Sequence, residues 1–377
     1  MIKATDTRYM AMALQLAERG LYSAHPNPRV GCVVVNEGEV VGTGWHQKAG
    51  EAHAEVNALA AAGERARGAT AYVTLEPCSH HGRTPPCAQA LVDAGIARTV
   101  IATGDPNPAV AGRGLALLRA AGVETDSGVL AEPAWQLNAG FLRRMAGGAP
   151  WVRLKLAASL DGRTAMASGE SQWITGSDAR RDVQRLRARS GAIMTGSGTV
   201  SADDPSLTVR AFEMGETGGK ALPPEQPLRV VLDPCLGTDP GARVIQGEGE
   251  CLLVSTPAAV DEGRAARLRE HGAEVVTVAP DSRGRPALRA VVELLAARGI
   301  NDVLIEAGAT LAGAALEAQV IDELWLYQAP TILGSRARPM AELALDQMAQ
   351  QHRMAVWERR VVGADQRLIL KPAAHAH

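Results

Sequence analysis

The sequence predicts a two-domain α/β protein, on the strength of three observations. Its 377 residues are more than one hydrophobic core usually holds. In both halves of the chain, short apolar runs typical of buried strands alternate with segments of helical periodicity. A run of small residues at 146–150 separates the two halves. We therefore expect one domain over residues 1–147 and a second over residues 151–372.

The elements of the first half follow from local periodicity and from turn and capping residues. Asp6 or Thr7 can cap a first helix, which Gly20 ends. Two strand-like runs on either side of residues 36–39 predict a hairpin. The elements expected in this half are helix 6–20, strands 30–35 and 40–45, helix 53–62, strand 71–75, a helix from Cys87, strand 99–103, and helices 114–121 and 134–145.

The second half repeats the alternation of strands and helices, with a Gly-, Glu- and Pro-rich loop at 212–227. The expected strands are 151–157, 192–195, 228–232, 251–255, 274–278, 302–305 and 324–329. The expected helices are 178–189, 262–270, 287–297 and 311–318.

Composition excludes several classes of protein. The net charge of -2 offers no general attraction to a polyanion, and two Phe, four Tyr and six Trp are too few for a base-stacking platform. The spacing of the five cysteines does not indicate a disulfide framework. Because the sequence also lacks an apolar signal segment and any run of eighteen apolar residues, we expect a cytoplasmic protein.

The first half carries a motif typical of a catalytic zinc site. One imidazole, His53, and two thiols, Cys78 and Cys87, give three ligands, and catalytic zinc sites keep the fourth position for water. In zinc deaminases of bases, a glutamate two residues after the histidine moves the protons without binding the metal. Glu55 occupies that position relative to His53. His53 and Glu55 can share a site only if their helix meets it end on, since residues two apart point about 200° from each other.

The spacing of the cysteines departs from the base-deaminase pattern, which has two residues between them. Here eight residues intervene, so a simple nucleoside deaminase is not the expectation. Two alternatives remain open: a structural zinc site closed by His80, His81 or His46, and no metal at all.

In the second half, two strand-to-helix turns can bind phosphate. Residues 306–313 and 195–199 are rich in Gly and small residues, and backbone amides at such a helix start can cradle an anion. Neither is a full dinucleotide fingerprint, so each can also be a tight turn that needs small residues. The arginines of helix 178–189 form either a solvated, salt-bridged face or a phosphate contact.

These residues together resemble the bifunctional riboflavin-biosynthesis deaminase/reductase family over nearly the whole chain. The resemblance rests on HPNPRVG at 25–31, AGEAHAE at 49–55 and TLEPCSHHGRTPPC at 74–87. In the second half it rests on KLAASLDGRTA from Lys155, SQWIT from Ser171, ADDPSLTVR from Ala202 and EAG from Glu306. The resemblance implies a cytidine-deaminase-like zinc domain followed by a dihydrofolate-reductase-like domain.

The resemblance also implies two consecutive reactions. A 2,5-diamino-6-(5-phosphoribosylamino)pyrimidin-4-one loses its ring amine, and NADPH then reduces the ribosyl group to ribityl. By matching motifs, His53, Cys78 and Cys87 hold Zn²⁺ and Glu55 is the acid/base. The deaminase pocket is implied to contain Asn27, His46, Arg83, Asp105 and Asn107. The implied NADPH contacts are Ala157, Trp173, Thr199, Asp203, Gly308, Ala309, Thr310, Leu311, Ala312, Gly313 and Ala314. Ser171, Arg187, Leu207, Arg210 and Glu306 match the reductase substrate side.

Physical chemistry is consistent with part of this assignment. Arg187 and Arg210 can form a cationic fork for a phosphomonoester. Asp203 and Glu306 are the candidates for protonating the opening sugar, and sequence alone does not choose between them. The resemblance further implies a homo-oligomer, with a dimer as the simplest form.

Three rival functions remain. A nucleic-acid base deaminase requires a basic, aromatic-bearing surface, which the composition disfavours. A one-step enzyme with a regulatory second domain predicts that NADPH does not bind. A zinc-stabilised interaction module predicts that Glu55→Gln changes nothing while chelation unfolds the first half.

Overall fold

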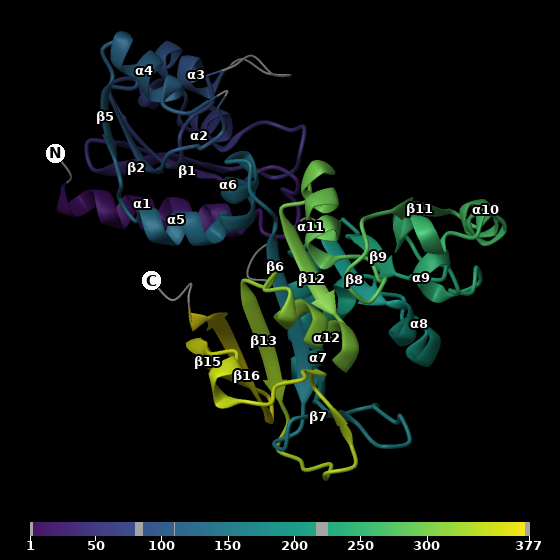
Figure 1. The fold of residues 1–377 in the computed structure, drawn as a ribbon. Coiled ribbons are helices and arrows are strands. Elements are labelled where there is room, and N and C mark those ends of the chain that lie inside the picture. Colours follow the sequence, from purple (N-terminus) through teal and green to yellow (C-terminus); the bar gives the residue numbers. More distant parts are fainter. Residues whose placement is uncertain (1–2, 80–85, 109, 216–224, 374–377) are drawn as a thin grey trace. The chain divides into compact units, whose positions relative to one another are not determined.

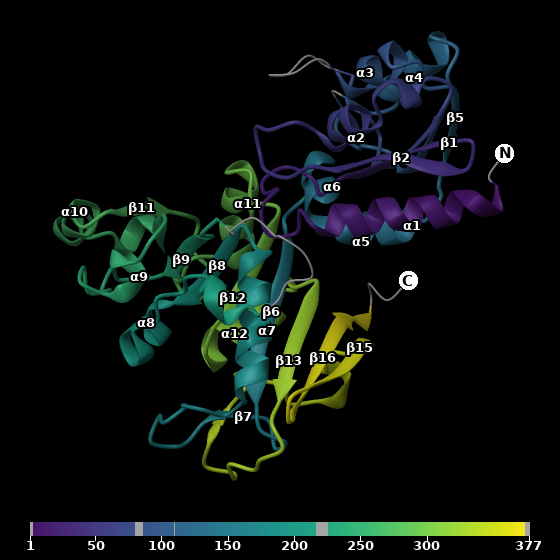
Figure 2. The ribbon, with the colours of Figure 1, turned by 180° about the vertical axis from the view of Figure 1, so that it is seen from behind.

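The structure is a computed structural model that describes residues 3–79, 86–108, 110–215 and 225–373. The described chain forms two compact units, one within residues 3–149 and the other from Pro150 onward (Figures 1 and 2). Each unit is built on its own sheet. Within these described ranges, no helix has both the length and the apolar character needed to cross a membrane.

The first unit is a three-layer α/β/α arrangement around a five-stranded sheet of order β2-β1-β3-β4-β5. The strands are β1 (Gly31–Asn36), β2 (Glu39–Trp45), β3 (Thr70–Leu75), β4 (Arg98–Thr103) and β5 (Glu124–Ser127). β1 is antiparallel to β2 and to β3, whereas β3, β4 and β5 run parallel. The helices are α1 (Ala4–Glu18), α2 (Ala54–Ala62), α3 (Cys87–Asp93), α4 (Arg113–Ala120), α5 (Ala131–Leu137) and α6 (Ala139–Met145).

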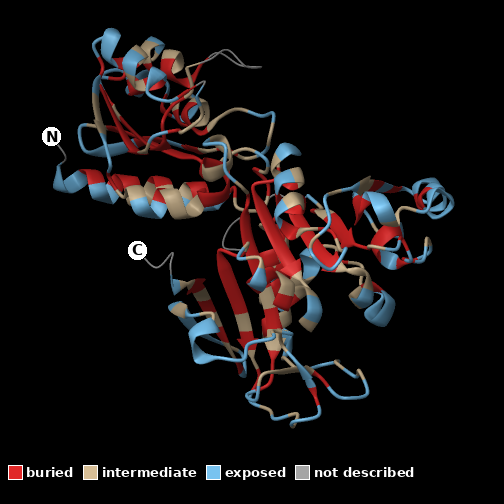
Figure 3. Ribbon diagram, viewed as in Figure 1, coloured by how far each residue is buried: buried red, intermediate tan, exposed pale blue. Residues whose placement is uncertain are grey.

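Alternation along the strands directs side chains to two separate cores. On β1, Cys32 and Val34 pack with the helices α2, α3, α4 and α6, whereas Val33 and Val35 pack with α1 and α5. This is the period-two pattern of a strand covered on both faces. Figure 3 shows the buried residues gathered on these central strands.

Glycines let α2 lie directly on β2, and this contact places the start of α2. A Cβ at Gly44 would stand 2.4 Å from the carbonyl oxygen of Ala54, and one at Gly42 would stand 2.2 Å from that of Ala58. No side chain fits at these distances, so the two glycines set how closely the helix approaches the strand. The first turn of α2 is thereby held at one end of the sheet.

Asp6 has a different role from the predicted helix cap. Lys3 is the N-cap of α1, and Asp6 lies in the first turn, where it accepts a hydrogen bond from the Lys3 backbone N–H at 2.7 Å. Its carboxylate is fully buried and also binds Arg98 of β4 through two hydrogen bonds of 2.8 and 2.9 Å, and Tyr72 of β3 at 2.8 Å. The side chain therefore ties the helix to the sheet.

Asp6→Asn is expected to destabilise the first unit by about 3 kcal/mol, because it leaves the buried Arg98 without its main counter-charge. Hydrogen bonding from Arg98 holds the pKa of Asp6 well below its usual range. A carboxyl group whose pKa is lowered on folding stabilises the protein above its unfolded pKa, near 3.9, and loses that contribution as pH falls further. Urea unfolding at pH 7 and at pH 3 tests this, and a difference between variant and parent that is equal at both values would contradict it.

The second unit contains a nine-stranded sheet of order β11-β10-β9-β8-β12-β6-β13-β16-β15. The seven strands from β11 to β13 are parallel, and the β16 and β15 hairpin adds antiparallel strands at one edge. The strands are β6 (Trp151–Ala158), β7 (Arg163–Ala165), β8 (Ala192–Gly196), β9 (Leu228–Leu232), β10 (Cys251–Ser255), β11 (Ala273–Thr277), β12 (Asp302–Glu306), β13 (Glu323–Gln328), β14 (Arg338–Pro339), β15 (Met354–Val362) and β16 (Asp365–Pro372), with β7 and β14 paired apart from the main sheet. The helices are α7 (Ser177–Ala188), α8 (Ser197–Asp203), α9 (Arg243–Gln246), α10 (Glu262–Glu270), α11 (Leu288–Ala297) and α12 (Ala309–Glu317).

Several elements differ from expectation. The single helix predicted at 134–145 is two helices, α5 and α6, separated at Asn138. The Asn138 side chain exchanges two hydrogen bonds with the backbone of Arg29, so a tertiary contact breaks the helical run. The hairpin of β15 and β16 was not predicted, because six of the nine residues of β15 are exposed and the strand shows no apolar alternation. Residues 216–224 of the predicted loop lie outside the described chain.

Candidate active sites

The predicted deaminase residues gather at one end of the first sheet. The carboxyl ends of β3 and β4 share an end because these strands are parallel, and the start of β1 and the end of β2 lie at that same end because they are antiparallel to their neighbours. Asn27 precedes β1, His46 follows β2, Cys78 follows β3, and Asp105 follows β4. Topology therefore assembles residues that are far apart in sequence.

Three potential zinc ligands converge at this end. His53 is the N-cap of α2 and Cys87 is the first residue of α3, so the two helices deliver their ligands from their N-termini. The Nδ1 atom of His53 lies 3.2 Å from the Cys87 Sγ and 3.7 Å from the Cys78 Sγ. In a tetrahedral zinc site, nitrogen and sulfur ligands stand about 3.6 Å apart. The three ligand atoms all lie within 4.8 Å of one another, so they fit a zinc ion and leave a fourth position open.

The neighbours of Cys78 stabilise its thiolate form. Hydrogen bonding from Cys87, together with His53, lowers the pKa of Cys78 to about 4. The Cys87 backbone N–H also donates to the Cys78 sulfur at 3.3 Å. Thiolates are the form of cysteine that binds metal, so this sulfur is suited to hold a cation.

Glu55 lies in the first turn of α2, beside the ligand set. Its side chain is buried, and burial raises its pKa to about 7. A carboxyl group with a pKa near neutrality can both accept and release a proton. The end-on approach of the helix expected from the sequence is present, because His53 is the cap and Glu55 follows in the first turn.

His46 and Asn27 form a hydrogen-bonded pair next to the ligands. The Nδ1 of His46 lies 3.2 Å from the carbonyl oxygen of Ala52, and its Nε2 lies 3.0 Å from Nδ2 of Asn27. Since a carbonyl oxygen only accepts, Nδ1–H donates to Ala52 and Nε2 accepts from the Asn27 amide. Burial lowers the pKa of His46, which favours this neutral form. His46 is thus occupied with these partners, and its ring meets His53 edge on at 5.3 Å.

Of the remaining predicted pocket residues, Asp105 and Asn107 lie in the segment after β4. Asp105 is buried, and its Oδ1 accepts a hydrogen bond of 2.8 Å from the Asn107 backbone N–H. Arg83 lies outside the described residues, as do His80 and His81, which the alternative structural zinc site would use. Sequence reasoning gave no role to Glu76, although its carboxylate accepts backbone N–H groups from the same segment.

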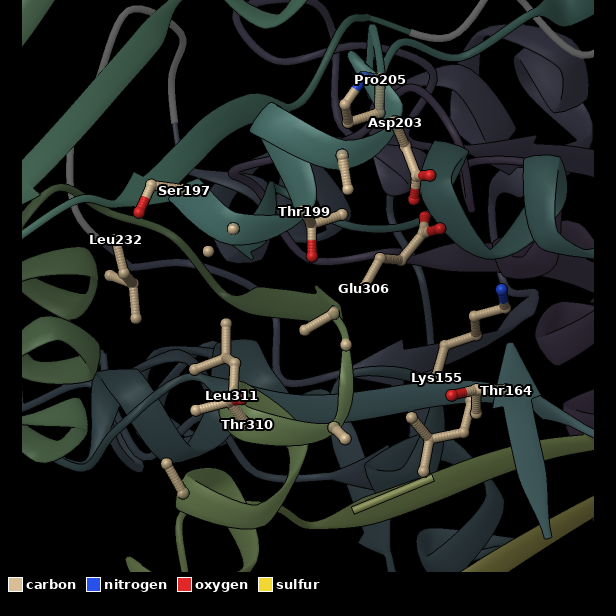
Figure 4. A pocket seen from close by; sticks show the side chains of 18 of the residues that line it. Lys155, Thr164, Ser197, Thr199, Asp203, Pro205, Leu232, Glu306, Thr310 and Leu311 are labelled. Atoms are coloured by element: carbon tan, nitrogen blue, oxygen red, sulfur yellow. The ribbon is translucent and has the colours of Figure 1, made fainter. Parts of the chain in front are cut away.

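The second unit has a cavity of about 1250 Å³ at the carboxyl ends of its parallel strands. Ligands bind at this edge in open α/β sheets. Most of the predicted reductase residues line the cavity, and Figure 4 shows Thr199 and Asp203 of α8 near Glu306. The predicted residues in the lining are Ala157, Ser171, Trp173, Arg187, Thr199, Asp203, Leu207, Arg210, Glu306, Gly308, Ala309, Thr310, Leu311 and Ala314.

Ala312 and Gly313 are not part of that lining, and both are buried within α12. A Cβ at Gly313 would stand 2.0 Å from the carbonyl oxygen of Glu342. The chain around Glu342 crosses the helix here, with its backbone N–H bonded to the carbonyl oxygen of Ala309 at 3.0 Å. Gly313 is therefore required by the close packing of α12 against the backbone at Glu342.

Glu306 is held by an arginine inside the cavity. The Arg187 Nε and Nη2 bind its two carboxylate oxygens at 2.6 and 3.1 Å, and Nη1 donates to the carbonyl oxygen of Thr208. Burial by itself would raise the pKa of Glu306, but the charge and hydrogen bonds of Arg187 outweigh it and lower the pKa. Glu306 is consequently an ionised group in the resting site.

The predicted cationic fork of Arg187 and Arg210 is not formed, because Arg187 is committed to Glu306. Arg210 pairs with Glu213 at 2.6 Å, and both side chains are about one-third exposed. Such a partly solvated ion pair contributes little to stability. Both arginines line the cavity, and Arg210 is the more exposed of the two.

Lys155 is a cavity residue to which sequence reasoning gave no role. It lies opposite Glu306 in the parallel pairing of β6 with β12. Burial lowers the pKa of its ammonium group, Glu306 opposes this change, and Arg187 adds to it. The available signal was that Lys155, like Arg153, is a charged residue within the otherwise apolar strand of 151–157.

The comparisons with known proteins agree in both halves. Residues 3–103 match the cytidine and deoxycytidylate deaminase zinc-binding region, and residues 150–362 match the RibD C-terminal domain. The chain is 52% identical to riboflavin biosynthesis protein RibD of Escherichia coli over 96% of this chain and 97% of that one. It is 46% identical to the Haemophilus influenzae RibD over 97% of each chain.

Two solved structures resemble the whole chain. Acinetobacter baumannii RibD superposes with a TM-score of 0.89 at 46% identity, covering 98% of this chain and 99% of that one. A diaminohydroxyphosphoribosylaminopyrimidine deaminase/5-amino-6-(5-phosphoribosylamino)uracil reductase from Thermotoga maritima gives a TM-score of 0.82 at 30% identity with the same coverage. These likenesses confirm the expected pairing of a cytidine-deaminase-like domain with a dihydrofolate-reductase-like domain. The chain therefore belongs to the RibD family of riboflavin biosynthesis enzymes, which join a deaminase and a reductase in one polypeptide.

Proposed function

We propose that residues 1–147 deaminate 2,5-diamino-6-(5-phosphoribosylamino)pyrimidin-4-one and that residues 151–372 reduce the resulting ribosylaminouracil with NADPH. The product is 5-amino-6-(5-phosphoribitylamino)uracil. The observation that carries this proposal is the convergence of His53, Cys78 and Cys87 beside the buried Glu55. The substrate follows the activity named for the Thermotoga maritima relative.

In the deaminase, His53, Cys78 and Cys87 would hold Zn²⁺. When bound there, zinc activates a water for attack on the ring carbon that bears the amine. Glu55 takes the proton of the attacking water and passes it to the departing amine, which leaves as ammonia. The Asn27 amide N–H donates to His46. This hydrogen bond orients the side-chain oxygen of Asn27 as an acceptor for an N–H group of the pyrimidine.

In the reductase, NADPH supplies a hydride to C1′ of the ribosyl group. The bond from C1′ to the ring oxygen breaks, and that oxygen takes a proton to become a hydroxyl. Lys155 is the proton donor, with the proton on Nζ, because Arg187 keeps Glu306 ionised while burial makes the ammonium of Lys155 more acidic. Arg210 leaves its ion pair with Glu213 and binds the substrate phosphate instead.

Two features support NADPH as the nicotinamide cofactor. Gly308 is the N-cap of α12, where backbone N–H groups suit a pyrophosphate. Further along the same edge, past β9 and β11, the cavity lining includes Arg243 and Arg289. Five strand spacings of about 4.8 Å separate β6 from β11, enough for an extended dinucleotide. Arginines at that end suit the 2′-phosphate that distinguishes NADPH from NADH.

We also propose a homo-oligomer, which the surface of β15 supports. Val356, Trp357 and Val361 are 62%, 56% and 72% exposed on this edge strand. Exposed apolar residues on an edge strand are typical of a surface that a second chain covers. Light scattering gives the mass directly, and a monomer at micromolar concentration would contradict the proposal.

Mass spectrometry of the reaction products tests the function. The zinc-loaded protein is incubated with the diaminopyrimidine ribosylamino phosphate alone, with NADPH, or with NADH. Deamination adds about one mass unit without cofactor, and reduction adds about two more with NADPH and far more slowly with NADH. A first change without a second would reject the reductase assignment, and equal rates with both cofactors would reject the preference for NADPH.

A further inference from the structure

Glu76 lies between β3 and the zinc-ligand position Cys78, and it is 5% exposed. Its carboxylate is surrounded by backbone N–H groups. Oε2 accepts from Asp105 at 3.4 Å and from Gly112 at 3.1 Å. Oε1 accepts from Gly114 at 3.1 Å and from Leu115 at 3.4 Å. The charge is further stabilised because these donors include the N-terminus of α4.

These four donors belong to the segment that follows β4, so Glu76 joins that segment to the turn carrying Cys78. Backbone packing reinforces the junction: a Cβ at Gly114 would stand 2.0 Å from the carbonyl oxygen of Pro77. Residues 104–108 and 110–115 therefore hold a fixed relation to the turn at 76–78.

The same segment carries two residues of the deaminase pocket. Asp105 gives its backbone N–H to Glu76, and its own Oδ1 accepts from the Asn107 backbone N–H at 2.8 Å. A chain of hydrogen bonds thus runs from Glu76 through Asp105 to Asn107. Errors of about 1 Å in such positioning can cost 100-fold in rate.

We propose that Glu76 is a positioning residue of the deaminase, which fixes Asn107 relative to the Cys78 turn so that the pyrimidine ring is held at the site of attack. Glu76 acts through the backbone N–H groups of Asp105, Gly112, Gly114 and Leu115 and does not touch the substrate. This inference rests on the proposed deaminase function and on the placement of Asn107 in its pocket, which the family resemblance implies. It explains why a buried, ionisable side chain that has no cationic partner within the described part of the chain stands two residues from Cys78.

Glu76→Gln tests the proposal, because the amide keeps the shape but turns an NH₂ group toward backbone N–H donors. Binding is measured by calorimetry with the pyrimidine substrate in a Glu55→Gln background, which prevents turnover. We expect Kd to rise by about 10- to 100-fold. Zinc should stay at the stoichiometry of the parent, and reductase turnover should be unchanged. Asn107→Ala should cost less in the Glu76→Gln protein than in the parent, because the two residues act in one path.

Three controls separate the outcomes. Asp6→Asn, a buried carboxylate change elsewhere in the same unit, should lower stability without altering Kd. Glu76→Asp keeps the carboxylate on a side chain one methylene shorter, and it should bind the substrate more tightly than Glu76→Gln does. This variant also tests the proposal if Glu76→Gln fails to fold. Additive effects of Glu76→Gln and Asn107→Ala, or a Kd equal to that of the parent, would overturn the positioning role. If Asn107→Ala alone leaves Kd unchanged, the assignment of Asn107 fails, and the path fails with it.

Discussion

Glu55→Gln is expected to lower deaminase turnover by about 10²- to 10⁴-fold while zinc remains bound, because the amide cannot carry the proton from water to the leaving amine. Zinc retention follows from the ligand set, since His53, Cys78 and Cys87 are untouched. Ammonia release measures the first step, and metal analysis of the same sample measures zinc. The second unit should still reduce the ribosylaminouracil when that compound is supplied directly.

Glu64→Gln is the matched control, since it makes the same chemical change at an exposed glutamate of the same unit. It should leave ammonia release unchanged. If Glu55→Gln retained full turnover, Glu55 would not be the acid/base, and the rival of a zinc-stabilised interaction module would regain weight.

Lys155→Met should lower reductase turnover by about 10²- to 10⁴-fold, the usual contribution of a positioned acid. The methionine fills a similar volume but has no proton for the ring oxygen. Deamination should continue, so the ribosylaminouracil should accumulate and mass spectrometry should show only the first change. NADPH should still bind, because Lys155 lies on β6 and the turn proposed to hold the pyrophosphate begins at Gly308 on a different element.

Lys371→Met is the control for this variant, because Lys371 is buried in the same unit but stacks on Trp357 at 3.6 Å, away from the cavity lining. It should preserve turnover. Normal reduction by Lys155→Met would remove the lysine as proton donor. A lost affinity for NADPH would instead mean that Lys155 holds the cofactor.

Sequence patterns predicted the parts of both sites that depend on local spacing. The position of Glu55 two residues after His53 required a helix meeting the site end on, and α2 begins there. Strand ends were also predictable, which is why Glu306 and Thr199 were placed near a phosphate turn and do line the cavity. Local periodicity determines these features, and it can be read from one chain.

Partners chosen by tertiary contact could not be predicted in this way. Arg187 was expected to bind a phosphate, but a helix pattern does not reveal that Glu306 lies opposite it. Lys155 gained its role only from strand order, because β6 and β12 are separated by about 150 residues in sequence. Glu76 likewise needed the fold, since its partners come from the segment after the next strand.

The register of β6 against β12 has a consequence for how this reductase can change. Lys155 and Glu306 stand opposite each other on neighbouring strands, so their separation is a property of the sheet and not of any connecting loop. Insertions in the loops around the cavity can therefore reshape substrate recognition without disturbing this pair. A single-residue insertion within β6 ahead of Lys155 would instead turn its side chain to the opposite face of the sheet. Within this unit, changes in the loops can alter substrate specificity. The distance between Lys155 and Glu306 can change only if the register of β6 against β12 changes.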